Sequence, residues 1–204
     1  NMAFVPPDAT ARSATGIPTG RLGMWWVVAS EVVIFGGLIM CYLIHRLGNP
    51  NWGDEAAFTI VNAGALNTFV LLTSSYWIVR AHKHVNEGEL DKAVRDMYLT
   101  IACAGVFLLV KTYEYGTEIH ELMVNYAHPE TGHIIGTYPV FWAFYFTATG
   151  LHALHVIGGA AAIYIVSRGV KKGENLQRVE YAGIYWHFVD VVWVFLFPLF
   201  YIAK

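Results

Sequence analysis

Five stretches of predominantly apolar residues constrain this fold more than any other feature of the sequence. They cover approximately residues 22–44, 60–79, 94–115, 138–166 and 181–203. A helix needs roughly 20 such residues to cross the hydrocarbon core of a bilayer. Only 14% of the 204 residues are charged, against about 25% in a typical soluble domain. The sequence therefore predicts an all-α, polytopic membrane protein, a bundle of five transmembrane helices.

The positions of the basic residues predict the orientation of this bundle. Ten of the thirteen Lys and Arg lie before the first stretch, between the second and third, or between the fourth and fifth. Because basic loops stay on the inner side of a membrane, we expect the N-terminus inside and the C-terminus outside. Residues 1–21 lack the apolar core of a signal peptide, so the expected organisation is an N-terminal cytoplasmic tail (1–21) and a five-helix domain (22–204). Interface anchors are expected among the aromatic residues near helix ends, which are Trp25, Trp26, Trp52, Tyr138 and Tyr181.

Several function classes find no support in the sequence. The net charge of −2 gives no reason to expect nucleic-acid binding. Cys41 and Cys103 both lie in apolar runs, so neither a disulfide framework nor a CxxC site is available. We find no phosphate loop, nucleophile motif or paired catalytic carboxylates. A transporter is disfavoured because no inverted repeat is visible.

Seven ionisable residues interrupt the apolar stretches, and each is costly there, at about 2.5–3.5 kcal/mol for a charge at a helix centre. Glu31 and Asp190 lie nine residues into the first and fifth stretches, roughly 14 Å deep at 1.5 Å per residue. We expect them to form one polar layer with the histidines of the fourth and fifth stretches, Asp190 accepting from an imidazole or indole. Lys111 is expected to snorkel outward at the end of its helix. The full set is Glu31, Lys111, Glu114, His152, His155, His187 and Asp190.

Two cofactor hypotheses compete with this packing interpretation. His152 or His155, with His187, could hold a haem b between helices. The segment "EIHELMVNYAHPETGH" could hold a metal through its histidines and glutamates, namely Glu118, His120, Glu121, His128 and His133. Hydrogen-bonded packing and an exposed acidic loop are the simpler interpretations, and we predict no catalytic, cofactor or metal site. A proton path through Glu31 and Asp190 would need a continuous row of polar residues, which the stretches do not show.

Five ordered motifs carry a resemblance to a known family. They are "LGMWWVVASEVVIFGGL" around Glu31, "LNTFVLLTSSYWIVRA", "YEY" around Glu114, "FTATGLHALHVIGG" with His152 and His155, and "YWHFVDVVWVFLF" with Trp186, His187, Asp190 and Trp193. Together they span most of the chain, which resembles subunit III of haem–copper respiratory oxidases in its short, five-helix form. Longer members have two further N-terminal helices that form one wall of a lipid cleft. Lys111 also departs from the family pattern.

The resemblance implies a subunit that is not itself catalytic and holds neither haem nor copper, which belong to partner subunits. It implies docking on catalytic subunit I of a proton-pumping oxygen reductase, support of proton uptake, and bound phospholipid in a bacterial plasma membrane. Cytochrome c oxidase is the first interpretation. Quinol oxidase and a nitric-oxide-reductase-associated relative are alternatives, and a stand-alone haem b protein is the alternative of another class. The residues expected at buried polar, lipid or subunit contacts are Glu31, Glu114, His152, His155, Trp186, His187, Asp190 and Trp193.

Overall fold

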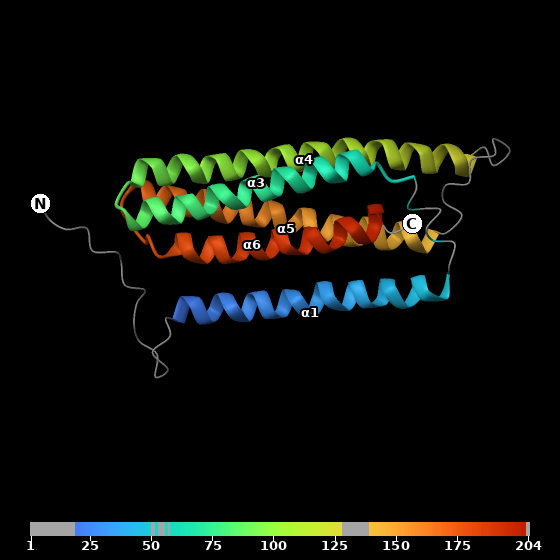
Figure 1. The fold of residues 1–204 in the computed structure, drawn as a ribbon, viewed down its shortest axis with the longest axis horizontal. Coiled ribbons are helices and arrows are strands. Elements are labelled where there is room, and N and C mark those ends of the chain that lie inside the picture. Colours follow the sequence, from blue (N-terminus) through green and yellow to red (C-terminus); the bar gives the residue numbers. More distant parts are fainter. Residues whose placement is uncertain (1–18, 50–51, 53–55, 57, 128–138, 203–204) are drawn as a thin grey trace, which may run out of the picture.

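Five long helices make up the described part of the chain, where the prediction of an all-α protein is confirmed. The computed structural model describes residues 19–49, 52, 56, 58–127 and 139–202. Their helices run side by side with their axes nearly aligned (Figure 1). The start of α1, the α3–α4 turn and the α5–α6 turn share one end of the bundle. The elements are α1 (Thr19–Gly48), α3 (Val61–Asn86), α4 (Leu90–Ala127), α5 (Pro139–Lys171), α6 (Arg178–Phe197) and the π-helical turn η2 (Pro198–Ile202).

Four segments are long and apolar enough to cross a membrane: 19–48, 90–124, 139–171 and 178–202. Helix α3 is not among them, although it matches the second predicted stretch. Its buried face includes Asn67 and Ser74 beside Leu71 and Ile78, which lowers its mean hydropathy. This helix makes most of its contacts with α4 and α6, so its buried polar side chains, such as Asn67 and Ser74, face other helices of the bundle.

Helix α4 is longer than the sequence predicted. It continues to Ala127, whereas the predicted stretch ended near residue 115. Glu118, His120 and Glu121 therefore lie on a helix, and their assignment to a loop was wrong. The apolar Ile119 and Leu122 continue the helical pattern, and the polar residues Glu118, His120 and Glu121 beside them obscured it. His128, His133 and Tyr138 lie outside the described residues.

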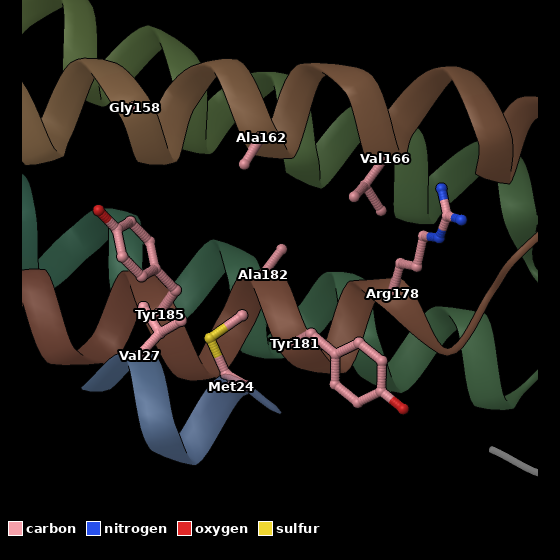
Figure 2. A pocket seen from close by; sticks show the side chains of 9 residues that line it. All are labelled: Met24, Val27, Gly158, Ala162, Val166, Arg178, Tyr181, Ala182 and Tyr185. Carbon is pink, nitrogen blue, oxygen red and sulfur yellow. The ribbon is translucent and has the colours of Figure 1, made fainter. Parts of the chain in front are cut away.

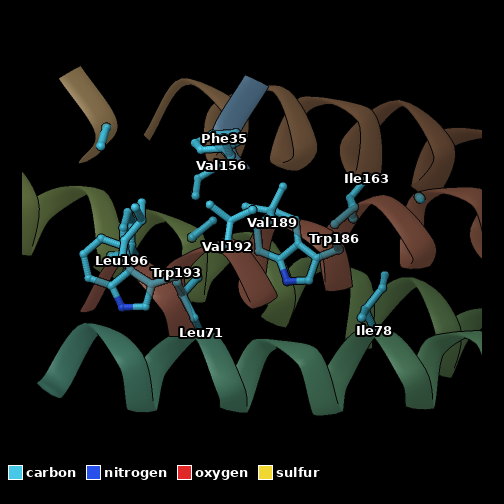
Figure 3. Close-up of a cluster of buried hydrophobic side chains, with 14 of the residues drawn as sticks. Phe35, Leu71, Ile78, Val156, Ile163, Trp186, Val189, Val192, Trp193 and Leu196 are labelled. Atoms are coloured by element: carbon cyan, nitrogen blue, oxygen red, sulfur yellow. The ribbon is translucent and has the colours of Figure 1, made fainter. Parts of the chain in front are cut away.

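The core forms where α6 meets α3, α4 and α5, with Trp186 and Trp193 at its centre (Figure 3). Both indoles are fully buried because α6 is surrounded on most sides. Helix α1 lies at the edge of the bundle and buries only Phe35 and Tyr42. This arrangement makes four helices a packed body and α1 a peripheral element.

The predicted interface anchors divide into two kinds. Trp25 and Trp26, near the start of α1, are 58% and 72% exposed, as an anchor in a bilayer interface should be. Trp52 is 2% exposed, and its ring packs 5.5 Å from Tyr42 and 6.1 Å from Phe141, centroid to centroid. The prediction that Trp52 anchors the chain at the surface was therefore wrong.

The last turn of the chain changes its helical pitch at Pro198. Proline has no N–H to donate to the preceding turn and its ring crowds the carbonyl four residues earlier. The helix widens there into η2, a π-helical turn. This turn places Phe200 and Tyr201 in the interior, where the Tyr201 hydroxyl joins a buried polar cluster described below.

Candidate functional site

The first polar pair is partly buried and joins α1 to α5. Glu31 Oε2 lies 3.0 Å from His155 Nε2, and His155 Nδ1 lies 2.8 Å from the Leu151 carbonyl oxygen. Nδ1 carries a proton, which it donates to that carbonyl. A hydrogen bond between Nε2 and Glu31 Oε2 then needs a second proton, carried either by Nε2 or by the carboxyl group. The edge of Phe35 covers the imidazole, with centroids 5.2 Å apart. The pair is thus one of the polar contacts that join the peripheral helix to the rest of the bundle, beside the Arg21–Glu180 ion pair and the hydrogen bond from the Tyr42 hydroxyl to the Leu199 carbonyl.

A second polar group lies where α3 meets α6, and we call it the α3–α6 seam: Thr68, Ser74, Ser75, Trp186, His187, Asp190 and Trp193. The Ser75 hydroxyl donates to Asp190 Oδ2 at 2.6 Å and lies 2.8 Å from His187 Nδ1. Because the hydroxyl proton goes to Asp190, the imidazole is the donor to Ser75 Oγ. Asp190 therefore accepts from a hydroxyl, and not directly from an imidazole or indole as the sequence suggested.

The two indoles of the seam also bond to hydroxyls of α3. Trp186 Nε1 donates to Ser74 Oγ at 2.9 Å, and Trp193 Nε1 donates to Thr68 Oγ1 at 3.0 Å. Ser74 and Thr68 donate in turn to carbonyls of their own helix, those of Leu71 and Gly64. The hydroxyls of Ser74 and Thr68 thereby make two hydrogen bonds each, which explains these two polar residues of α3 by packing. Asn67 of α3 is also fully buried, and its amide has no hydrogen-bond partner among the described residues.

His152 stands apart from both groups. It is fully buried, with its ring centroid 5.4 Å from that of Phe107 and 5.1 Å from that of Trp193. Among the described residues, neither of its ring nitrogens has a hydrogen-bond partner. The expected single polar layer is thus divided into the Glu31–His155 pair, the His187–Ser75–Asp190 chain and an isolated imidazole. His152 and His187 contact different neighbours, which does not support haem ligation by these two.

The densest polar cluster was not foreseen, and we call it the Lys111 cluster: Lys111, Glu114 and Glu118 of α4, Tyr145 of α5 and Tyr201 of η2. Lys111 Nζ lies 3.1 Å from Glu114 Oε2, 3.1 Å from the Tyr145 hydroxyl and 2.8 Å from the Tyr201 hydroxyl. The lysine is 3% exposed, so the prediction that it snorkels outward was wrong. The aliphatic part of its side chain leads between the helices, where the ammonium group meets the three oxygen atoms just named.

The two acids of the Lys111 cluster share a single tyrosine. The Tyr145 hydroxyl lies 2.8 Å from Glu114 Oε1 and 3.0 Å from Glu118 Oε1. Glu118 is 1% exposed, and its Oε2 has no hydrogen-bond partner among the described residues. The three charged residues recur at i, i+3 and i+7, which is one face of a helix. That signal was present in the sequence, but the predicted helix ended before Glu118.

These features define a multi-pass helical membrane protein whose buried polar residues bond mainly to one another across helices. A model of the family described as cytochrome c oxidase subunit III matches residues 9–204. The chain belongs to that family.

Individual relatives agree with the family match. Cytochrome c oxidase subunit 3 of Thermostichus vulcanus is 32% identical over 186 residues, which cover 89% of this chain and 86% of the relative. Quinol oxidase subunit 3 of Bacillus spizizenii is 32% identical over 188 residues, 88% of this chain and 86% of the relative. A heme-copper oxidase subunit I+III of Aeropyrum pernix is 29% identical over 195 residues, 90% of this chain and 22% of that longer protein. The chain is therefore a non-redox subunit III of a haem–copper oxidase, and the stand-alone haem b alternative is not favoured.

Proposed function

We propose that this chain docks on catalytic subunit I of a proton-pumping cytochrome c oxidase, stabilises it and supports proton uptake. The observation that carries the proposal is the large exposed apolar surface of the chain, above all on α1. On α1, Trp26, Val33 and Ile44 are 72%, 74% and 61% exposed. Contiguous apolar surface of this extent is covered by lipid or by a partner. The fusion of subunits I and III in one relative supports subunit I as that partner.

We further propose five membrane spans in a bacterial plasma membrane, with the N-terminus inside and the C-terminus outside. Helix α3 lies beside α4 (Figure 1), and its 26 residues are enough to cross a bilayer, which supports a fifth span in spite of its polar residues. The α3–α4 and α5–α6 turns share one end of the bundle with the start of α1. Those segments carry most of the basic residues, so the positive-inside rule assigns that end to the inner side.

We propose a phospholipid site in a groove of about 500 Å³ between α1, α5 and α6 (Figure 2). Its walls are apolar apart from the guanidinium of Arg178 and the tyrosine hydroxyls, and Arg178 lies at the end nearest the α5–α6 turn. An apolar trough with a cation at its interfacial end suits an acyl chain and its phosphate. The lining residues are Met24, Val27, Gly158, Ala162, Val166, Arg178, Tyr181, Ala182 and Tyr185.

The lipid proposal is tested by counting phospholipids in the purified oxidase. Arg178→Gln removes the cation and Gly158→Leu fills the groove, and each should lower the phospholipid retained per complex. Activity should then decay faster during turnover while the initial rate is kept. Lys172→Gln is a matched control because it removes an exposed cation at the same end, outside the groove. Equal phospholipid in all four preparations would contradict the proposal.

The supporting role is tested by removing the chain from the complex. We expect oxygen reduction at high pH to persist, because the redox groups are proposed to belong to other subunits, while the activity decays sooner during turnover. An unchanged lifetime would contradict the role. Cytochrome c is the proposed electron donor and quinol is the alternative, since relatives of both kinds match at 32% identity. Oxidation of each donor by the purified complex decides between them.

A further inference from the structure

The turn between α3 and α4 gathers one imidazole and two carboxylates that no part of the proposed function uses. They belong to His84, Glu87 and Glu89. One donor atom from each lies within 4.8 Å of the donor atoms of the other two. His84 Nδ1 is 3.0 Å from Glu89 Oε2 and 3.5 Å from Glu87 Oε2. We propose that these three side chains bind a divalent transition-metal ion of the zinc class.

The backbone of the turn places the three side chains together. The Glu89 N–H donates to the His84 carbonyl at 2.9 Å, and the Gly88 N–H donates to the Val85 carbonyl at 3.1 Å. With Gly88 at φ 79°, this is the Schellman arrangement that ends many helices. The side chains that meet across such a turn are usually apolar. In this turn the two positions carry His84 and Glu89, whose side chains can both bind a metal.

The spacing of the donor atoms fits tetrahedral coordination. Bonds of about 2.0–2.2 Å from Zn²⁺ to nitrogen and oxygen place neighbouring ligand atoms about 3.3–3.4 Å apart. The two contacts of Nδ1, at 3.0 and 3.5 Å, lie on either side of that value. The glutamate side chains are 46% and 41% exposed, so they can rotate to close the third side. Water can occupy the remaining position.

A buried carboxylate stands behind the imidazole. Asp96 is fully buried, and its Oδ2 lies 3.5 Å from His84 Nε2 and 3.2 Å from Arg80 Nε. Oδ2 accepts no hydrogen bond, and neither ring nitrogen of His84 has a hydrogen-bond partner among the described residues. Once a metal takes the lone pair of Nδ1, the ring proton lies on Nε2, where the Asp96 carboxylate is placed to accept it. This carboxylate–histidine pairing is common behind metal sites.

The neighbouring lysines leave the ligand atoms available. Lys92 Nζ lies 2.8 Å from Glu89 Oε1, and Lys83 Nζ lies 3.7 Å from Glu87 Oε1. Each glutamate thus directs Oε1 to an exposed lysine and Oε2 to His84. The mixture of one nitrogen and two oxygen donors selects against Ca²⁺ and Mg²⁺, which take oxygen ligands. The bound ion joins the last turn of α3 to the start of α4.

The experiment measures metal binding to the full chain in detergent after treatment with a chelator. The wild type should bind about one more Zn²⁺ ion per chain than His84→Ala or Glu89→Gln, whatever the other histidines bind. Asp96→Asn should weaken that binding roughly 10- to 100-fold. His82→Ala is the matched control. The His82 imidazole belongs to the same helical turn as His84 but lies outside the cluster. Binding to this variant should equal that of the wild type.

Cobalt and calcium supply independent readouts. Co²⁺ bound to the wild type should show the visible absorption of a tetrahedral site, and His84→Ala should lose it. Excess Ca²⁺ should not displace the zinc, because Ca²⁺ prefers oxygen ligands and binds weakly to an imidazole nitrogen. Equal zinc binding by the wild type and His84→Ala, or complete displacement by Ca²⁺, would overturn the proposal. So would a His82→Ala variant that loses as much zinc as His84→Ala.

Discussion

Two polar regions inside the same bundle solve the problem of burial in different ways. The α3–α6 seam uses mainly neutral donors and acceptors, with each indole or imidazole bonded to one hydroxyl of α3. The Lys111 cluster buries an ammonium and two carboxylates and links them through tyrosine hydroxyls. A neutral hydrogen bond can be lost at a modest cost, but an unpaired buried charge cannot. The difference predicts a ranking of substitutions.

Lys111→Met should have the largest effect. It leaves the buried carboxylate of Glu114 without its cation, and breaking a buried ion pair in this way costs about 3–5 kcal/mol. The free energy of unfolding in mixed micelles, followed by tryptophan fluorescence, measures it. Lys172→Met is the control, since that lysine is exposed and its loss should change little. If both variants unfold alike, the cluster contributes no more than a surface charge does.

Ser75→Ala should come second, at about 2–3 kcal/mol, because it removes one hydroxyl from two partners at once. Asp190 Oδ2 and His187 Nδ1 both lose the bond that the structure gives them. Thr73→Ala is the matched control, because the Thr73 hydroxyl is exposed and bonds only to its own helix. A Ser75→Ala variant as stable as Thr73→Ala would show that the seam does not depend on this hydroxyl. The same unfolding measurement applies.

Gly159→Ala tests how closely α5 approaches the seam. A Cβ atom at this position would lie 2.9 Å from the ring of Trp186, an overlap that forces the helices apart. Overpacking of this kind costs about 1–3 kcal/mol, and the helix preference for alanine returns roughly 0.5–1 kcal/mol. Gly158→Ala has open space within 4 Å and should be neutral or slightly stabilising. Equal thermal midpoints for the two variants would mean that the helices relax without cost.

Glu31→Gln should have the smallest effect of the four. The side chains of Glu31 and His155 are 20% and 15% exposed at the edge of the bundle, and an amide can still bond to the imidazole. We expect less than about 1 kcal/mol, as for a partly solvated ion pair. The more sensitive measurement is retention of the subunit by the purified oxidase. If Glu31→Gln lowered the free energy of unfolding as much as Lys111→Met, the polar pair at the edge of the bundle would matter as much as the buried cluster, and our comparison would be wrong.

The polar residues were predictable as a set, but their pairing was not. Glu31, Asp190 and the histidines stand out in apolar stretches, and their depth follows from counting residues along a helix. Sequence position does not give the rotation of one helix against another. His155 therefore meets Glu31 while His152, three residues earlier, faces Phe107 and Trp193. The hydroxyls of α3 went unnoticed because serine and threonine are common in membrane helices.

The sequence by itself determined the number of long helices, their approximate bounds and the family, because apolar length and ordered motifs are local properties of the chain. Only the tertiary structure decided that Lys111 is buried and that Trp52 packs inside. It alone brought α4, α5 and η2 together around one ammonium. The physical reason is that a buried charge is tolerated only where partners from several elements converge, and convergence is set by packing.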